Sequence, residues 1–315
     1  MTRERTDKPF LGTLPGLILG CLVSCGLWGS AYPCVKIGYE LFGITGSDVA
    51  SRLVFAGTRF TIAGIMVVVG VSIAQRRALL PAKRDLGAIG ILALFQTVLQ
   101  YFFFYGGLSH AAGVTSSIIG AAAYFFAILF AALIFKTENL TRKAVIGCTV
   151  GFAGVVLVNL GGSGDAAFSF ALNGEGFILL SSVAGAISTC FISVLGRTHD
   201  SVLLSGWQFV TGGIVLLGCG LAMGGRLVPT SPAPAVALIL YMGFISAMAY
   251  TLWSRLLAAN PVSRVSIFGF MTPVFGAAMS AVILGETDAV NPLFAVIALA
   301  LVSAGIVIVN RPNGQ

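Results

Sequence analysis

Long uncharged, apolar stretches separated by short charged clusters run through almost the whole chain. Residues 86–135, for example, contain no Asp, Glu, Lys or Arg. A helix needs about 20 mainly apolar residues to cross the hydrocarbon core of a bilayer. The pattern therefore predicts an all-α integral membrane protein with ten transmembrane helices. We place them at 15–38, 52–74, 86–108, 113–135, 143–161, 175–196, 202–222, 234–256, 262–284 and 291–309.

The composition favours the same fold class. Only 9% of the 315 residues are charged, against about 25% in ordinary soluble domains. A soluble enzyme, a nucleic-acid-binding protein and a disordered chain are therefore poor interpretations. The net charge of +7 comes from clusters between apolar stretches and forms no basic face, so no nucleic-acid partner is expected. The expected partners are the lipid bilayer and a small molecule.

Positive charges are distributed unevenly over the predicted loops. With the N-terminus inside the cell, fourteen Lys and Arg residues fall on the cytoplasmic side and two, Arg52 and Arg226, on the outer side. Cytoplasmic loops carry an excess of such residues. Both termini are therefore expected in the cytoplasm, in a multi-pass protein of the inner (plasma) membrane. The first apolar stretch is too long for a signal peptide and is expected to stay in the mature chain.

The two halves of the sequence align with an offset of 148–149 residues. Gly57-Thr58-Arg59-Phe60 matches Gly206-Trp207-Gln208-Phe209, Tyr101 matches Tyr250, and Glu138 matches Glu286. An offset that contains five spans, an odd number, predicts two repeats inverted in the membrane, the arrangement used for alternating access. The predicted divisions are an N-terminal tail (1–14), the first repeat (15–161), an external linker (162–174), the second repeat (175–310) and a C-terminal tail (311–315).

Three short motifs resemble a known family. Trp28-Gly29-Ser30, Arg59-Phe60, and Pro273 followed by Gly285-Glu286 are similar to the EamA-type permeases of the drug/metabolite transporter superfamily, over about residues 15–310. The resemblance implies two inverted five-helix repeats around a central cavity, and transport of amino acids and related small metabolites. The first half has Tyr124 near the position of Pro273. Only the second half thus carries a proline that can act as a hinge.

A stripe of four side chains in the first span is the first candidate for a transport path. Ser24, Trp28, Tyr32 and Lys36 recur every four residues, so they lie on one slowly turning helix face. We favour a cavity wall for this face. Lys36 either attracts an anionic group of the substrate or extends to the lipid headgroups, and both interpretations stay open.

Arg59 lies about a third of the way into the second span, where insertion of an arginine costs about 2.5–3.5 kcal/mol. No Asp or Glu is predicted at the middle of any span. Arg59 therefore either binds the anionic part of a substrate or extends to the outer headgroups. Tyr39 and Trp253 fit interfacial anchors. The remaining candidates for substrate contact are Gln96, Gln100, Tyr101, Ser117, Tyr124, Ser246 and Tyr250.

The leading hypothesis is a secondary transporter of a small metabolite, an amino acid or a derivative, with export favoured. A second hypothesis is transport or flipping of a phosphorylated or lipid-linked metabolite, with Lys36 and Arg59 binding phosphate. A membrane-embedded enzyme is the least favoured hypothesis, because the acidic residues lie at loops and the two histidines are far apart in the sequence. The six cysteines lack zinc-ligand spacing and are expected to be packing residues. No metal or cofactor is expected, no coupling ion can be named, and a monomer is the default.

Overall fold

The computed structural model describes residues 10–111, 113–160, 171–285 and 292–311, and within them every regular element is helical. Two 3₁₀ turns at Phe10–Gly12 and Lys83–Asp85 precede longer helices. The main elements are α1 (Leu14–Leu41), α2 (Val49–Gln75), α3 (Leu86–Leu92), a π-helical segment (Ala93–Leu99), α4 (Gln100–Leu108), α5 (Gly113–Leu133), α6 (Arg142–Leu160), a π turn (Leu172–Gly176), α7 (Phe177–Leu195), α8 (Ser201–Ala222), α9 (Pro232–Ala259), α10 (Val262–Ser266), a 3₁₀ segment (Ile267–Phe270), α11 (Met271–Leu284) and α12 (Pro292–Asn310).

The helices match the apolar stretches of the sequence closely. In the described part of the chain, nine helical stretches are long and apolar enough to cross a membrane, which agrees with an integral membrane protein. The predicted span 143–161 corresponds to α6, which ends at Leu160. That α6 also crosses the membrane, making ten spans, stays a prediction. Most of the predicted linker 162–174 lies outside the described residues.

Two predicted spans are interrupted helices. Residues 86–108 form α3, the π-helical segment and α4 in sequence, and residues 262–284 form α10, the 3₁₀ segment and α11. A π-helical turn inside a helix is rare and is found mostly at functional sites. Both interruptions therefore mark positions where the chain departs from a simple membrane-spanning rod.

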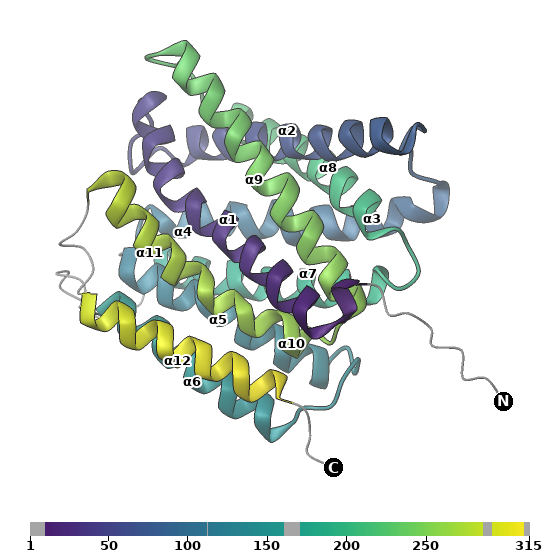
Figure 1. Cartoon of the computed structure of the whole chain (residues 1–315). Helices are drawn as coiled ribbons and strands as arrows, with labels where there is room; N and C mark the ends of the chain where they lie inside the picture. Colours follow the sequence, from purple (N-terminus) through teal and green to yellow (C-terminus); the bar gives the residue numbers. More distant parts are fainter. Residues whose placement is uncertain (1–9, 112, 161–170, 286–291, 312–315) are drawn as a thin grey trace.

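The helices pack in recurring pairs (Figure 1). α2 lies along α8, α6 along α12, and α1 is placed between α9 and α11. Glycines allow the first two pairs to approach closely, as small residues do in membrane helix pairs. A side chain at Gly57 would meet the backbone of α8 at Gly213 and Leu217, and one at Gly147 would meet the Gly305 carbonyl of α12.

Several contacts gather at one end of the bundle. Asn260, after α9, donates to the Leu11 carbonyl before α1 over 2.8 Å, and Glu138, after α5, accepts from the Ser263 amide at 2.9 Å. Lys143 at the start of α6 reaches the Arg311 carbonyl after α12. The beginning of α1 and the end of α12 therefore lie at the same end, called here the terminal end (Figure 1). That this end faces the cytoplasm stays a prediction.

Glu138 caps a helix from a neighbouring loop. Its second oxygen accepts the Ser263 hydroxyl at 2.8 Å, so the carboxyl holds the first turn of α10. Burial raises the pKa of the Glu138 carboxyl, while the bonds from Ser263 oppose that shift. Glu286, its match in the second half, lies outside the described residues.

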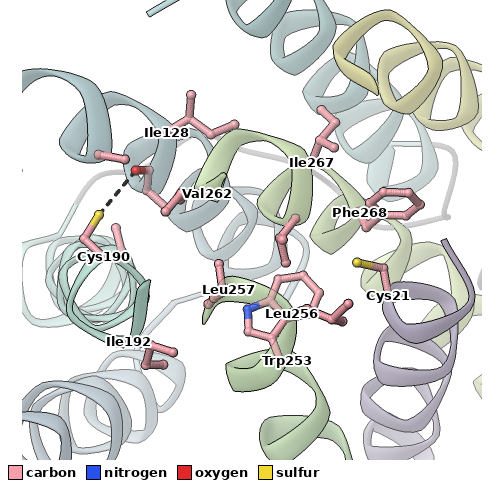
Figure 2. Packing of buried hydrophobic residues seen from close by; sticks show 14 of the residues in the cluster. Cys21, Ile128, Cys190, Ile192, Trp253, Leu256, Leu257, Val262, Ile267 and Phe268 are labelled. Carbon is pink, nitrogen blue, oxygen red and sulfur yellow. Dashed lines mark hydrogen bonds between the residues drawn. The ribbon is translucent and has the colours of Figure 1, made fainter. Parts of the chain in front are cut away.

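A large apolar core fills the terminal end (Figure 2). Trp253, Leu256 and Leu257 of α9 pack there against Val262 of α10 and Phe268 of the 3₁₀ segment. Cysteines contribute as small packing residues, as expected. Cys21 and Cys190 are fully buried, and the Cys190 thiol donates to the Ala127 carbonyl at 3.4 Å. This core closes the terminal end of the bundle.

Candidate functional site

Trp28 of α1 packs inside the bundle against α9. Its ring centroid lies 4.9 Å from that of Tyr250 and 5.0 Å from that of Trp253. The indole Nε1 is buried without a hydrogen-bond partner, an unsatisfied state that is unusual for a buried donor. The interfacial interpretation of Trp253 is wrong, because its side chain is 4% exposed and packs on Trp28.

Two contacts join residues that stand 149 positions apart. The hydroxyls of Tyr101 on α4 and Tyr250 on α9 share a hydrogen bond of 2.6 Å. Phe60 on α2 and Phe209 on α8 stack with centroids 5.2 Å apart and nearly parallel rings. Phe60 also lies 4.4 Å from Tyr101, and Phe209 lies 4.9 Å from Tyr250. These four rings form a continuous aromatic cluster across α2, α4, α8 and α9.

Arg59 lies at the edge of that cluster. Its guanidinium is centred 4.3 Å from the Phe60 ring and 5.7 Å from the Tyr101 ring, distances at which a cation is attracted to an aromatic face. The residue is 6% exposed and its Nε has no hydrogen-bond partner. Extension to the headgroups is therefore the wrong interpretation. Within the described parts of the chain, no carboxylate lies within 4.0 Å of this guanidinium.

Tyrosines surround Arg59 and extend the cluster. The Arg59 guanidinium is centred 5.7 Å from the Tyr101 ring, which lies 6.0 Å from the Tyr105 ring, and the Tyr101 hydroxyl bonds that of Tyr250. We call Tyr101, Tyr105, Tyr250 and Arg59 the tyrosine–arginine cluster. It offers one positive charge and several hydroxyl groups among apolar rings.

Exposure changes steadily along the predicted α1 stripe. Ser24 is 0% exposed, Trp28 is half-buried, Tyr32 is 45% exposed and Lys36 is exposed. The Tyr32 ring packs on Gly276 of α11. Exposure along the stripe therefore rises from the terminal end toward the opposite end, called here the loop end.

Two predicted glutamines face α7 and α8 instead of Arg59. Gln96 is 4% exposed and lines a small enclosed hollow with Ser205 and Ser254. Gln100 lies against Gly185 of α7. These contacts suit interhelical packing.

The remaining polar candidates differ in burial. Ser246 is 4% exposed in α9, and Ser117 is half-buried in α5. Neither is tied to the tyrosine–arginine cluster by a hydrogen bond among the described residues. Their contact with a substrate stays a prediction.

Pro273 lies in the first turn of α11, directly after the 3₁₀ segment Ile267–Phe270. A proline cannot donate the hydrogen bond that would continue an α-helix through this point, which accounts for the change of helix type. The Tyr124 ring packs directly on Gly269, where any side chain would clash with it. The structure thus shows a break at Pro273. Motion about it stays a prediction.

The sequence missed Arg52 and Tyr39 as interior residues. Arg52, assigned to an outer loop, is 6% exposed, with its guanidinium centred 5.1 Å from the half-buried Tyr39 ring. The Tyr39 hydroxyl is buried without a hydrogen-bond partner, so its interfacial interpretation is wrong. The spacing of Arg52 and Arg59, seven residues apart on one helix face, was the available signal.

The sequence also missed Thr97, in the π-helical segment. Its hydroxyl donates to Gln208 Oε1 at 2.7 Å. Gln208 is 0% exposed, and it occupies the position in the second half that matches Arg59. The π-helical segment therefore supplies Gln208 with a hydrogen-bond partner. No matching hydrogen bond is described for Arg59, its counterpart in the first half.

Among the described residues, no three His, Cys, Asp or Glu side chains are grouped so that they could hold a metal ion. The cluster geometry instead suits a small organic molecule. Aromatic rings can bury its apolar part, and the guanidinium can pair with a carboxylate or phosphate.

Comparison with known proteins assigns the family. The EamA-like transporter family matches this chain twice, over residues 14–160 and 172–311. The chain therefore belongs to the EamA-like transporter family, and it is a multi-pass membrane transporter of that family.

Relatives with known names are distant but cover most of the chain. A WAT1-related chloroplast protein of Arabidopsis thaliana is 26% identical over 91% of this chain and 68% of its own length. A probable terminal-alkyne amino-acid exporter of Streptantibioticus cattleyicolor is 25% identical over 90% of each chain. The uncharacterized inner membrane transporter YedA of Escherichia coli is 24% identical over 90% of this chain and 86% of its own.

One solved crystal structure shares the fold. It superposes with a TM-score of 0.75 over 95% of this chain and 97% of that chain, at 18% sequence identity. At that identity the similarity concerns the fold alone.

Proposed function

We propose that this protein is a secondary transporter that moves a small carboxylate-bearing metabolite, an amino acid or a derivative, by alternating access. The observation that carries the proposal is Arg59, a buried guanidinium among tyrosines with no carboxylate within 4.0 Å in the described residues. Burial of an uncompensated charge is costly. A substrate carboxylate would offset that cost each time it binds.

Three further features support the proposal. The named relative from Streptantibioticus cattleyicolor is a probable amino-acid exporter, which favours export here. The exposure of the α1 stripe rises from Ser24 to Lys36 toward the loop end, while an apolar core fills the terminal end, which suits one state of an alternating-access cycle. The contacts between residues 149 positions apart suit two inverted repeats that meet on a common axis.

The proposed setting follows from the charges. The terminal end carries most of the cations, among them Arg84, Lys143 and Arg255, so we place it in the cytoplasm and the protein in the inner (plasma) membrane. The ten spans, five in each repeat, then form a complete path in one chain, and the proposed working unit is a monomer. We propose no enzymatic step.

Counterflow in proteoliposomes tests the function. Vesicles are loaded with pools of unlabelled amino acids, and uptake of a labelled member of each pool is followed. We expect one pool to accelerate exchange, and the Trp28→Ala and Tyr32→Ala variants to slow it. Protein-free vesicles and the Gly70→Ala variant, at a position where an added side chain would meet no atom within 4 Å, serve as controls. Absence of exchange with every amino-acid pool in a folded preparation would reject this substrate class.

A second candidate substrate class is a phosphorylated or lipid-linked metabolite. The specific observation in its favour is the second buried guanidinium, Arg52, seven residues from Arg59 on the same helix. A phosphate monoester carries more charge than a carboxylate and pairs well with arginine. The same counterflow assay with sugar phosphates in place of amino acids separates the two classes.

A further inference from the structure

We propose that Arg52 and Tyr39 form an outer anion-binding site, distinct from Arg59, which receives the carboxylate or phosphate of a substrate at the loop end. The inference rests on the proposed transport function and deepens it. It assigns a first point of contact for the anionic group, and it requires that the transported molecule carry one.

Arg52 is held in place as a buried cation. It lies in the first turn of α2, is 6% exposed, and its guanidinium is centred 5.1 Å from the Tyr39 ring. Its Nε and Nη1 atoms are buried and have no hydrogen-bond partner. A surface arginine that merely kept the protein soluble would extend these donors into water. Their burial leaves hydrogen-bonding capacity that an incoming acceptor can use.

No protein acid in the described residues neutralises this charge. Asp48 stands one helical turn before Arg52, but its Oδ1 accepts the Ser51 amide at 2.9 Å and caps α2. No described carboxylate lies within 4.0 Å of the guanidinium. The Tyr39 hydroxyl is also buried and unpartnered. Because guanidinium and phenol both present donors, the complementary occupant is an anion with acceptor oxygens.

The position of Arg52 relates the outer site to the cluster. Seven residues separate Arg52 from Arg59, which is two helical turns and about 10 Å along α2 on one face. The Tyr39 ring contacts Arg52. An anion released by one guanidinium would therefore travel about 10 Å to reach the next.

The loop between α1 and α2 passes beside the outer site. A side chain added at Gly46 would come within 3.7 Å of Arg52 Nη2, so the loop backbone passes close to the guanidinium with no side chain at that point. Arg226, the other arginine expected at this end, is exposed. The chain thus offers a matched pair, one buried and one exposed arginine at the same end.

Thermal unfolding of the purified full chain tests binding without transport. Sodium acetate and sodium phosphate are titrated against the wild type, Arg52→Gln and Arg226→Gln. An anion that binds the folded protein raises its unfolding temperature, whereas a general salt effect acts equally on all three proteins. We expect Arg52→Gln to lose part of the rise and Arg226→Gln to keep it. The larger rise, with acetate or with phosphate, identifies the preferred anion. Equal rises in all three proteins would overturn the proposal.

Transport kinetics supply the second measurement. With the substrate found by counterflow, Arg52→Gln is expected to raise KM about tenfold at the loop end with a smaller change in kcat, and Arg52→Lys to restore part of the affinity. If Arg52→Gln fails to fold, Arg52→Lys and Tyr39→Phe carry the test. Unchanged KM in those variants would overturn the outer site while transport itself stood. If anions stabilise the wild type through Arg52 but none of the candidate substrates is transported, the proposed function is rejected and the anion-binding site is retained.

Discussion

The two halves of the molecule solve the same packing problem with different chemistry at positions 59 and 208. Both positions precede a phenylalanine of the stacked pair Phe60 and Phe209, on helices α2 and α8 that pack closely. Gln208 is 0% exposed and accepts a hydrogen bond from Thr97. Arg59 is 6% exposed and keeps its charge without a carboxylate within 4.0 Å in the described residues.

The comparison separates what helix packing requires at this position from what substrate binding requires. A neutral amide suffices to fill this position, as the second half shows, with its oxygen bonded to Thr97 and its nitrogen buried without a partner. An arginine there adds a desolvation cost that packing does not require. The charge of Arg59 is therefore best explained by binding of an anionic group. Gln208, at the matching position of the second half, is the control for packing alone.

The largest effect is expected from Arg59→Gln, which gives the first half the chemistry of the second. We expect transport to fall about 100-fold, since a hydrogen bond to a charged group contributes up to about 3 kcal/mol. Thermal stability should hold or rise, because an uncompensated charge is removed. Counterflow and thermal unfolding on one preparation measure both. A variant that transports normally would show that Arg59 has a purely structural role.

The sequence predicted the helices well because charges are excluded from the bilayer interior. The uncharged stretch before Lys36 and the one after Lys143 both became helices near their expected bounds. The match of Tyr101 with Tyr250 even paired two residues that touch. Burial of Trp253 could not be predicted, because it depends on where α1 and α9 lie, whereas the spacing of Arg52 and Arg59 gave a signal for Arg52.

Irregular helix geometry was equally hidden from the sequence. Residues 93–99 have an ordinary apolar pattern, yet they form a π-helical segment that presents Thr97 to Gln208. Only the tertiary contact with α8 distinguishes this segment. The break near Pro273 was predictable, because proline itself removes a hydrogen bond.

A smaller effect is expected where the halves are alike, at the glycine contacts of α2 and α8. A side chain at Gly57 would overlap the Leu217 backbone, which cannot move without shifting α8. We expect Gly57→Ala to lower the free energy of unfolding by about 1–3 kcal/mol, measured by SDS-induced unfolding in mixed micelles.

Gly70 in the same helix is the matched control for Gly57. An added side chain there would meet no atom within 4 Å. Gly70→Ala should therefore leave stability unchanged or raise it by about 0.5–1 kcal/mol. Equal losses in both variants would mean that the two helices do not depend on close approach.

The next effect concerns the bond between Tyr101 and Tyr250, where the halves meet. Tyr101→Phe and Tyr250→Phe each remove the same 2.6 Å hydrogen bond, and each should cost about 1 kcal/mol of stability. The double variant should cost less than the two losses added. Tyr241→Phe removes a longer, 3.2 Å bond to Ser30 from a 44% exposed tyrosine and should cost less. Fully additive losses would show that the two hydroxyls act independently.

The smallest effect is expected at a contact that only one end of the molecule has. Near the terminal end, His199 Nδ1 lies 2.8 Å from Asp85 Oδ1, and Asp85 also accepts the Ala82 amide. The positions that a 149-residue offset assigns to the other end are Ala50 and Pro234, which cannot form this pair. The contact thus ties α3 to the α7–α8 loop at the closed end alone.

Acid should weaken the contact between His199 and Asp85. The bond from His199, with the Ala82 amide, holds the pKa of the Asp85 carboxyl below its ordinary value. A lowered folded-state pKa stabilises the fold above about pH 4, the unfolded value, and the gain is lost as the pH falls through the folded value. The unfolding temperatures of wild type and Asp85→Asn should therefore differ at pH 5 and converge toward pH 3. Arg84→Gln, which removes a 79% exposed neighbour 3.8 Å away, should follow the wild type at both. A constant difference between wild type and Asp85→Asn would mean that the tie does not depend on the charge of Asp85.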